Sequence, residues 1–131
     1  MTHGFAKTLS LAACTLVSGA ALAPAAAPAA QICVPPPGLS GHWRGNDQGD
    51  YYIREIGNTV YWVGLDSTTN GAGWTHMFTG YRSGTTINGR WADVRGNSGA
   101  GTMKLVFAGM TMTRVASTGS GFGGSKWIKR C

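Results

Sequence analysis

From Gly41 onward the chain alternates short apolar runs with clusters of Gly, Asn, Asp and Ser. A period of two residues between such clusters is typical of β-strands with one buried face. The pattern predicts eight strands, at residues 41–45, 50–56, 59–65, 74–82, 85–94, 102–108, 110–116 and 125–130. No stretch of ten or more residues repeats with the period of a helix. We therefore expect an all-β fold, a small eight-stranded antiparallel up-and-down β-barrel.

The short connections support antiparallel neighbours. Gly57-Asn58 and Ser83-Gly84 each suit a two-residue hairpin turn. Alternation then assigns one side of each later strand to the interior, namely Ile87, Gly89, Trp91, Met103, Leu105, Phe107, Met110 and Met112. The third strand is apolar on both sides, with Val60 and Trp62 opposite Tyr61, Val63 and Leu65. It is either buried on both faces or exposes an aromatic patch.

The first thirty residues have the layout of a secretory signal peptide. Lys7 lies in a short polar start, and an apolar stretch rich in alanine and leucine follows. Small residues around positions 25–30 suit cleavage, so we assign 1–29 to the signal, 30–40 to a Pro-rich N-terminal arm and 41–131 to the barrel. The apolar stretch is too short and too interrupted to span a membrane. The expected location is secreted or periplasmic.

Three cysteines refine this picture. Cleavage removes Cys14 and leaves Cys33 and Cys131, which in an exported chain predict a disulfide that joins the two ends of the domain. Closing a loop of this length stabilises a fold by up to about 4.7 kcal/mol. The alternative is a lipoprotein, because Leu11-Ala12-Ala13-Cys14 resembles a lipobox, and Cys14 would then carry a lipid anchor. Its distance from Lys7 is short for that purpose.

Charge narrows the classes of partner. Loss of Lys7 leaves ten basic and five acidic residues, a net charge near +5. This balance favours solubility and attraction to anionic surfaces. Most basic residues are scattered, and only Lys126, Lys129 and Arg130 cluster. No nucleic-acid-binding signature accompanies them, so we expect no nucleic-acid partner.

Gly41-His42-Trp43 at the first strand resembles the G-x-W element of calycins, the lipocalin-like and avidin-like barrels. The resemblance implies that Trp43 closes one barrel end beneath a basic residue from the last strand, Arg130 or Lys129. The charged stretch that follows Trp43 does not suit biotin. Segments 43–62, 78–80 and 87–94 also resemble a widespread bacterial domain, and that resemblance implies no activity.

Catalytic chemistry finds little support in the sequence. Asp50 and Glu55 are a conceivable carboxylate pair for a hydrolase, but turn formation and ion pairing explain them more simply. Two mature histidines, His42 and His76, match no zinc-ligand spacing. Residues 46–50 lack the last ligand of a calcium loop. We therefore predict no enzyme, no metal site and no cofactor.

Aromatic residues are the best binding candidates. A small barrel can hold an apolar ligand or a glycan at its end through stacking side chains, here Trp62, Trp74, Phe78 and Trp91. Core packing is the simpler explanation for the same residues. The first hypothesis is a non-enzymatic binding module; the alternatives are a protein-binding, protease-inhibitor-like barrel that uses its arm, and a structural envelope protein.

Overall fold

The computed structural model describes residues 23–27, 34–95 and 99–131. The chain divides into two units, Met1–Gln31 and Ile32–Cys131. In the first unit, the described residues 23–27 form no helix or strand. Most of the predicted signal peptide, including Cys14, lies outside the described residues, as does Cys33, so the disulfide between Cys33 and Cys131 stays a prediction. No helix in the described part of the chain is long and apolar enough to cross a membrane.

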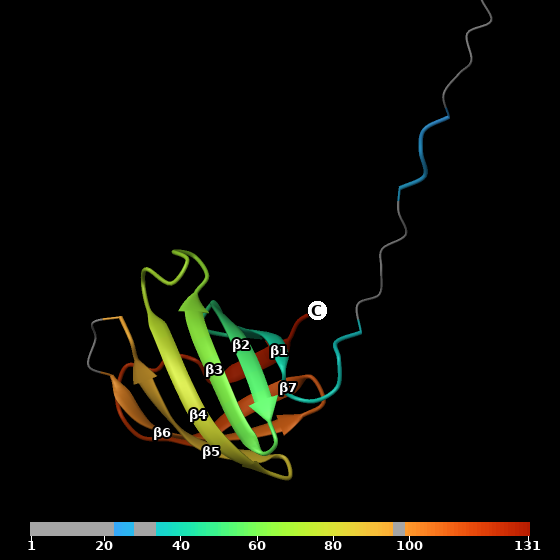
Figure 1. Ribbon diagram of the computed structural model, residues 1–131. Coiled ribbons are helices and arrows are strands. Elements are labelled where there is room, and N and C mark those ends of the chain that lie inside the picture. Colours follow the sequence, from blue (N-terminus) through green and yellow to red (C-terminus); the bar gives the residue numbers. More distant parts are fainter. Residues whose placement is uncertain (1–22, 28–33, 96–98) are drawn as a thin grey trace, which may run out of the picture. The chain divides into compact units, whose positions relative to one another are not determined.

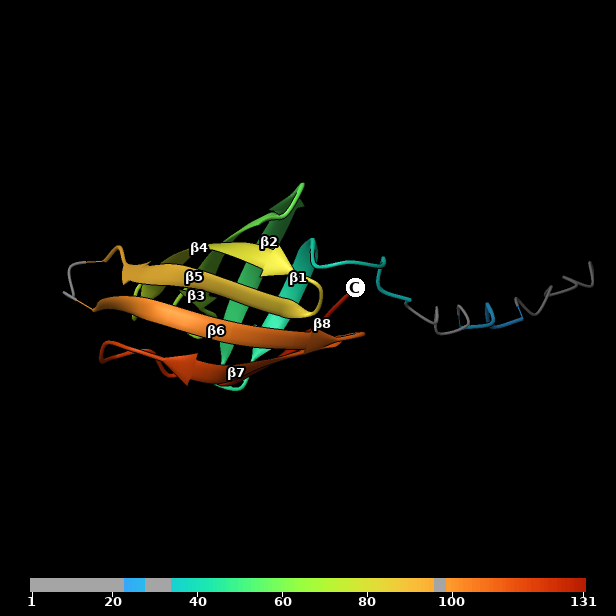
Figure 2. The same ribbon diagram turned by 90° about the horizontal axis from the view of Figure 1, so that it is seen from below.

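The second unit is a closed barrel of eight antiparallel strands in which each strand pairs with its neighbours in sequence and β8 pairs with β1 (Figures 1 and 2). The predicted fold class is therefore confirmed. The strands are β1 Gly41–Gly45, β2 Gly49–Ile56, β3 Thr59–Asp66, β4 Thr75–Ser83, β5 Thr86–Asp93, β6 Ala100–Ala108, β7 Thr111–Ser117 and β8 Lys126–Lys129.

Tight turns join β2 to β3, β4 to β5 and β6 to β7, and all three lie at one end of the barrel, since neighbouring strands run in opposite directions. Each turn contains a glycine with φ near +60°, at Gly57, Gly84 and Gly109, a conformation that L side chains disfavour. The second turn is Gly84–Thr85, one residue later than predicted. The connections after β1, β3, β5 and β7 lie at the opposite end, which we call the mouth.

The residues predicted to face the interior are buried or half-buried, with one exception. Ile87, Leu105 and Met112 are fully buried, as alternation requires. Met110 was predicted inside and is exposed, because it belongs to the turn after Gly109 and precedes the first residue of β7. On β3, Trp62 points inward and Tyr61 is exposed, so this strand presents aromatic side chains on both faces.

Large rings fill the interior because glycines on adjacent strands leave space for them. The Tyr51 ring lies across three strands, and a Cβ atom at Gly49 or Gly45 would come within 2.6 or 2.8 Å of it, while one at Gly64 would overlap it. Such contacts are far below normal van der Waals distance. Tyr51 and Trp62 then pack edge to face, with ring centres 5.6 Å apart. Interior glycine and interior aromatic residues are thus parts of one packing arrangement.

The turn end is closed by the N-terminal arm. Leu39 is fully buried, and its carbonyl accepts a hydrogen bond of 2.8 Å from the indole nitrogen of Trp43. The ammonium of Lys129 donates to the carbonyls of Pro36 and Gly38 at 2.5 and 2.7 Å and lies 5.8 Å from the centre of the Trp43 ring. Of the two basic residues considered as a cover for Trp43, it is therefore Lys129 that occupies this position, and Arg130 is exposed.

Replacing Gly64 tests the ring packing. Gly64→Ala places a methyl group against the Tyr51 ring, and overpacking of this kind costs about 1–3 kcal/mol. In a Tyr51→Leu background the same change should cost less, because the obstructing ring is gone. Urea unfolding of the four proteins of this double-mutant cycle measures the coupling. Strictly additive effects would contradict the packing described for Tyr51.

Lys129→Met tests the closure of the turn end. The change keeps an apolar stem and removes the ammonium that holds two arm carbonyls, so we expect a loss of about 1.5–3 kcal/mol in unfolding free energy and faster proteolysis of residues 34–40. Arg130→Met is the matched control and should change stability by less than about 0.5 kcal/mol. Equal losses in the two variants would show that Lys129 does not hold the arm.

Candidate functional site

Two hollows are lined by aromatic residues that the sequence predicts for binding. The larger, about 550 Å³, lies against β4, β5 and β6 and is lined by Met77, Phe78, Thr79, Arg90, Trp91, Ala92, Ala100, Gly101 and Thr102. The other, about 290 Å³, lies at the mouth and is lined by Asp47, Gly73, Trp74, His76, Asp93, Gly121 and Gly123. We call the second one the mouth cavity.

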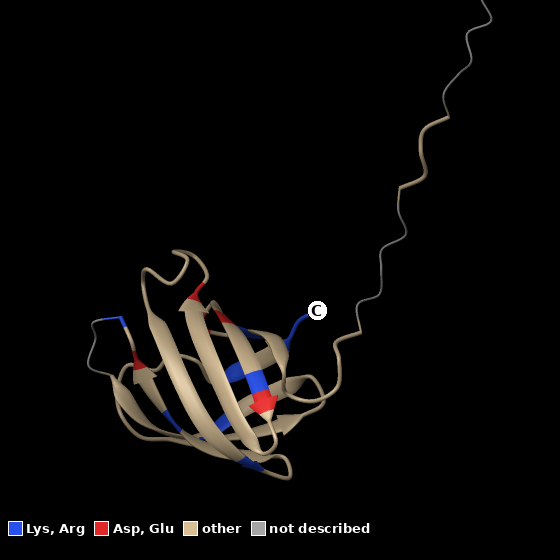
Figure 3. Cartoon of the chain, in the orientation of Figure 1, with Lys and Arg blue, Asp and Glu red and all other residues tan. Residues whose placement is uncertain are grey.

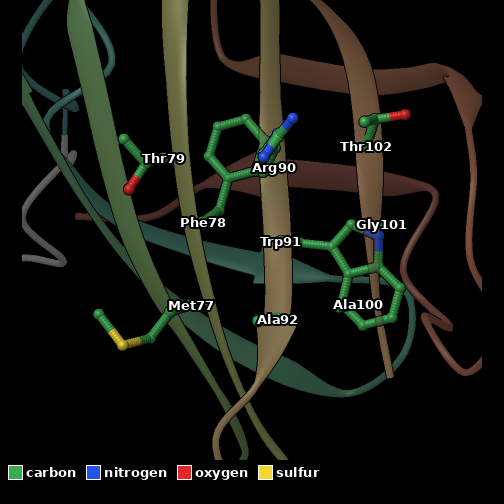
Figure 4. A pocket seen from close by; sticks show the side chains of 9 residues that line it. All are labelled: Met77, Phe78, Thr79, Arg90, Trp91, Ala92, Ala100, Gly101 and Thr102. Carbon is green, nitrogen blue, oxygen red and sulfur yellow. The ribbon is translucent and has the colours of Figure 1, made fainter. Parts of the chain in front are cut away.

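The larger hollow is a depression on the outer face of the sheet. Met77, Thr79, Arg90 and Thr102 alternate with the buried residues Phe78, Trp91 and Met103 and therefore point outward. Figure 4 shows the Trp91 indole reaching across to Gly101 of β6, where a Cβ atom would come within 2.9 Å of its nitrogen. The polar groups here are open to water. The hollow is a consequence of small residues on β6 rather than a preorganised site.

The mouth cavity begins with two residues on adjacent strands. His76 of β4 and Asp93 of β5 are direct partners in the antiparallel register, and both point inward. The imidazole Nε2 lies 3.8 Å from Asp93 Oδ1, beyond hydrogen-bond distance, and the two side chains are only 4% and 8% exposed. Burial lowers the pKa of His76, although the nearby charges of Asp93 and Asp47 act to raise it. His76 is therefore held in its neutral form near neutral pH.

Aromatic rings surround this pair. The Trp74 ring stacks on His76 at 4.6 Å between centres, and Phe122 lies 4.7 Å from the same imidazole. Trp91 meets both His76 and Phe122 edge to face, at 5.6 and 5.1 Å. Phe122 also contacts Trp62 and Trp127, whose ring centres lie 6.3 and 6.1 Å away. Phe122 thus occupies the centre of the mouth.

Phe122 lies in the connection between β7 and β8, in which four of the eight residues are glycines. The connection is anchored at both ends: Thr118 Oγ1 accepts from the Thr102 amide, and Ser125 bonds twice with the Asn46 side chain. At its middle, the Arg114 guanidinium donates to the Phe122 carbonyl at 3.0 Å. Gly121 and Gly123, on either side of Phe122, form one wall of the cavity.

Asp47 completes the polar side of the cavity. Its Oδ2 accepts a hydrogen bond of 2.5 Å from the Tyr51 hydroxyl, and its Oδ1 accepts from the Gly49 amide at 3.1 Å. Desolvation, aided by the Asp47 charge, raises the pKa of Tyr51 far above its ordinary value. The hydroxyl therefore stays protonated and acts as a donor.

Several buried polar atoms near the mouth have no hydrogen-bond partner among the described residues: Trp62 Nε1, His76 Nδ1, Asp93 Oδ1 and Trp127 Nε1. Most buried polar groups in folded proteins are paired, so each unpaired one requires an explanation. Two of these atoms belong to residues that line the cavity, and the other two belong to rings in contact with Phe122. Their grouping marks the mouth as the candidate site.

The four predicted binding residues are partly brought together. Trp62, Phe78 and Trp91 are buried in the core, with Trp62 and Phe78 stacked at 4.2 Å, whereas Trp74 is half-buried and lines the mouth cavity. The sequence analysis did not identify His76, Asp93 or Phe122 as binding residues. His76 lies two positions from Phe78 in β4, and Asp93 lies two positions from Trp91 in β5, so alternation alone predicts that both side chains point inward. Phe122 lies in a connection without periodicity.

The candidate hydrolase pair is not assembled. Asp50 lies near the start of β2, where it accepts hydrogen bonds from His42 and Arg44, and these lower its pKa against the opposing effect of burial. Glu55 lies near the other end of β2 and forms an ion pair with Arg82 at 2.6 Å. Among the residues that the structure describes, no three His, Cys, Asp or Glu side chains are close enough to hold a metal ion.

The acid sensitivity of the fold should depend on His76. Because the folded-state pKa of His76 is below that of an unfolded histidine, near 6.5, its contribution to stability is present above that pH and is lost as the pH falls toward the folded-state value. We expect the loss between pH 8 and 5.5, at most about 1.4 kcal/mol from this group, to be smaller in His76→Gln than in the wild type. Thermal unfolding measures it.

The control is His42→Gln, which changes a histidine on the outer face that bonds with Asp50. This variant should keep the acid-side loss of the wild type that arises from His76. An unchanged pH profile in His76→Gln would contradict the burial argument.

Comparisons with known protein families, with curated proteins and with solved structures find no match to this chain. The candidate site therefore rests on the geometry of the barrel and on its own residues.

Proposed function

We propose that this chain is a secreted, non-enzymatic binding protein that holds a small, flat, partly apolar ligand in the mouth of its barrel. The observation that carries the proposal is the set of unpaired polar atoms buried among aromatic rings. Ligand sites typically combine apolar and aromatic walls with a few placed polar groups. The mouth has this composition, while the turn end has its polar groups paired within the protein.

The cavity limits the size of the ligand. At about 290 Å³ it lies at the lower limit of ligand pockets, which range over about 300–1,000 Å³. A single ring with one or two polar substituents, or one sugar unit, suits this volume. Stacking of Trp74 on His76 leaves a half-buried indole at the rim, and a flat ligand can pack against such a surface.

The arm-based alternative, a protease-inhibitor-like barrel, has less support. Inhibition by insertion requires an arm that is free to enter the target. In this structure Lys129 holds the Pro36 and Gly38 carbonyls, and Leu39 is fully buried. The end of the arm next to the barrel is therefore used for closure. A non-enzymatic role is also supported by the separate ion pairs of Asp50 and Glu55.

A ligand screen tests the proposal. Small aromatic compounds, monosaccharides and apolar metabolites are screened by thermal shift and by tryptophan fluorescence, and the affinity of each hit is measured by calorimetry. Trp74→Ala removes the rim indole and should weaken binding about two- to tenfold, since stacking of this kind is worth about 0.5–1.5 kcal/mol beyond the buried area.

Two variants serve as controls. Tyr61→Ala removes an exposed aromatic ring on the outer face of β3 and should leave affinity unchanged. Arg90→Ala alters the outer hollow and should also have no effect. If Arg90→Ala weakens the binding of a hit and Trp74→Ala does not, the binding site lies on the outer face. A screen without hits would count against the binding function itself.

A further inference from the structure

The mouth cavity is acidic, although the chain as a whole is basic. Asp47 and Asp93 both line it, and none of the described lysines or arginines does. Figure 3 shows acidic residues at the mouth ends of β3 and β5, which end at Asp66 and Asp93. A carboxylate that lines a concave, ring-walled space acts more strongly on a ligand than one on an open surface, because water screens it less.

Asp93 lacks a balancing charge on its buried side. Its Oδ1 is buried and accepts no hydrogen bond from the described residues, and the side chain is 8% exposed. His76 Nε2 lies 3.8 Å from this oxygen and belongs to an imidazole that burial keeps neutral. A buried carboxylate oxygen without a donor is costly for a protein to maintain. A donor from a ligand would remove that cost.

Neither Asp47 nor Arg114 supplies this donor. Asp47 adds a second negative charge, and its own donors, the Tyr51 hydroxyl and the Gly49 amide, are neutral. The guanidinium of Arg114 is directed to the Phe122 carbonyl and lies 5.6 Å from the Phe122 ring centre, and Arg114 is not among the residues that line the cavity. The polar side of the cavity is therefore negative.

The walls suit a cation as well. Aromatic faces attract ammonium and guanidinium groups within about 6 Å, and the rings of Trp74, Trp91 and Phe122 all lie within 5.6 Å of the His76 imidazole beside Asp93. Carboxylates combined with aromatic walls are the composition that recognises organic amines. A neutral ligand with a hydroxyl group can donate to Asp93 Oδ1 but leaves the negative charge unbalanced, and an anionic ligand is repelled.

We infer that the ligand of the mouth cavity is a small organic cation, an amine or amidine on a flat apolar body, whose N–H groups donate to Asp93 Oδ1. This inference rests on the proposed binding function and specifies its ligand class. With the imidazole proton on Nε2, which faces Asp93, His76 Nδ1 offers a second acceptor. The apolar body packs against Trp74, and the glycines at positions 73, 121 and 123 leave room for it.

Three probes of similar shape and different charge test the inference: phenethylammonium, 2-phenylethanol and 3-phenylpropionate. Calorimetry with the purified wild-type protein at pH 7.5 should show the cation binding about tenfold or more tightly than the alcohol, since only the ammonium balances the negative charge of the carboxylate, at a site where water screens little. The carboxylate should bind most weakly. This comparison needs no variant and so does not depend on how substitutions affect folding.

Variants then locate the charge. Asp93→Asn keeps the shape of the side chain and should reduce the preference for the cation over the alcohol to within about threefold, with binding of the alcohol retained. Asp50→Asn removes the same charge on the outer face, where Asp50 bonds with His42 and Arg44, and should leave the preference intact. Near-UV circular dichroism confirms that each variant is folded.

The outcomes separate the two proposals. If the three probes bind with similar affinity and Trp74→Ala weakens all of them, the mouth binds ligands and the cation inference is wrong. A preference that survives Asp93→Asn, or that disappears in Asp50→Asn, also overturns it. If neither these probes nor the broader screen yields binding that depends on Trp74, the proposed function fails as well.

Discussion

The available space inside an eight-stranded barrel is the constraint on which the rest of this structure depends. The interior of such a barrel holds little more than its own side chains, and here much of it is filled by rings. A large ring fits only where the neighbouring strands carry glycine, because any other side chain at those positions would occupy the space of the ring. Tyr51 lies against Gly45, Gly49 and Gly64, while Phe78 has Gly80 and Gly89 next to its ring. The abundance of glycine and the abundance of aromatic residues in this chain therefore have the same cause, the packing of large rings inside a narrow barrel.

Filling the core with tryptophan and tyrosine also places polar N–H and O–H groups inside it. Tryptophan and tyrosine carry an N–H or O–H group that requires a partner when buried. At the turn end the requirement is met, since Trp43 donates to Leu39 and the Lys129 ammonium is held by arm carbonyls. Near the mouth Tyr51 has Asp47, but the indole nitrogens of Trp62 and Trp127 have no partner among the described residues. The two ends of one core thus differ in how completely their polar groups are paired.

Most of the fold could be predicted because its signals are local. Strand positions follow from a period of two, and the turns follow from glycine, so the observed strand boundaries lie within about two residues of the predicted ones. Met110 was misplaced because alternation was extended into a turn. The choice between Lys129 and Arg130 could have been made from parity, since Lys129 shares the inward face of Trp127 in β8.

The candidate site was less predictable because it depends on register and on a connection. Nothing local indicates that His76 and Asp93 will be direct partners, as 17 positions separate them in the sequence and only the pairing of β4 with β5 brings them together. Phe122 is positioned by contacts with four rings from different parts of the barrel and with the Arg114 guanidinium. Trp74 could be selected as an aromatic residue, but its role at the rim required its stacking on His76.

An acidic cavity in a basic protein raises the question of which charge a ligand experiences. The net charge is +6 for the full chain, and at long range this repels cations. At physiological ionic strength, however, exposed charges are screened beyond about 8 Å, so the scattered lysines and arginines slow the approach of a cation without controlling its affinity. Asp93 is largely removed from solvent and is screened far less. Net charge therefore governs the rate of encounter, and the local carboxylates govern what remains bound.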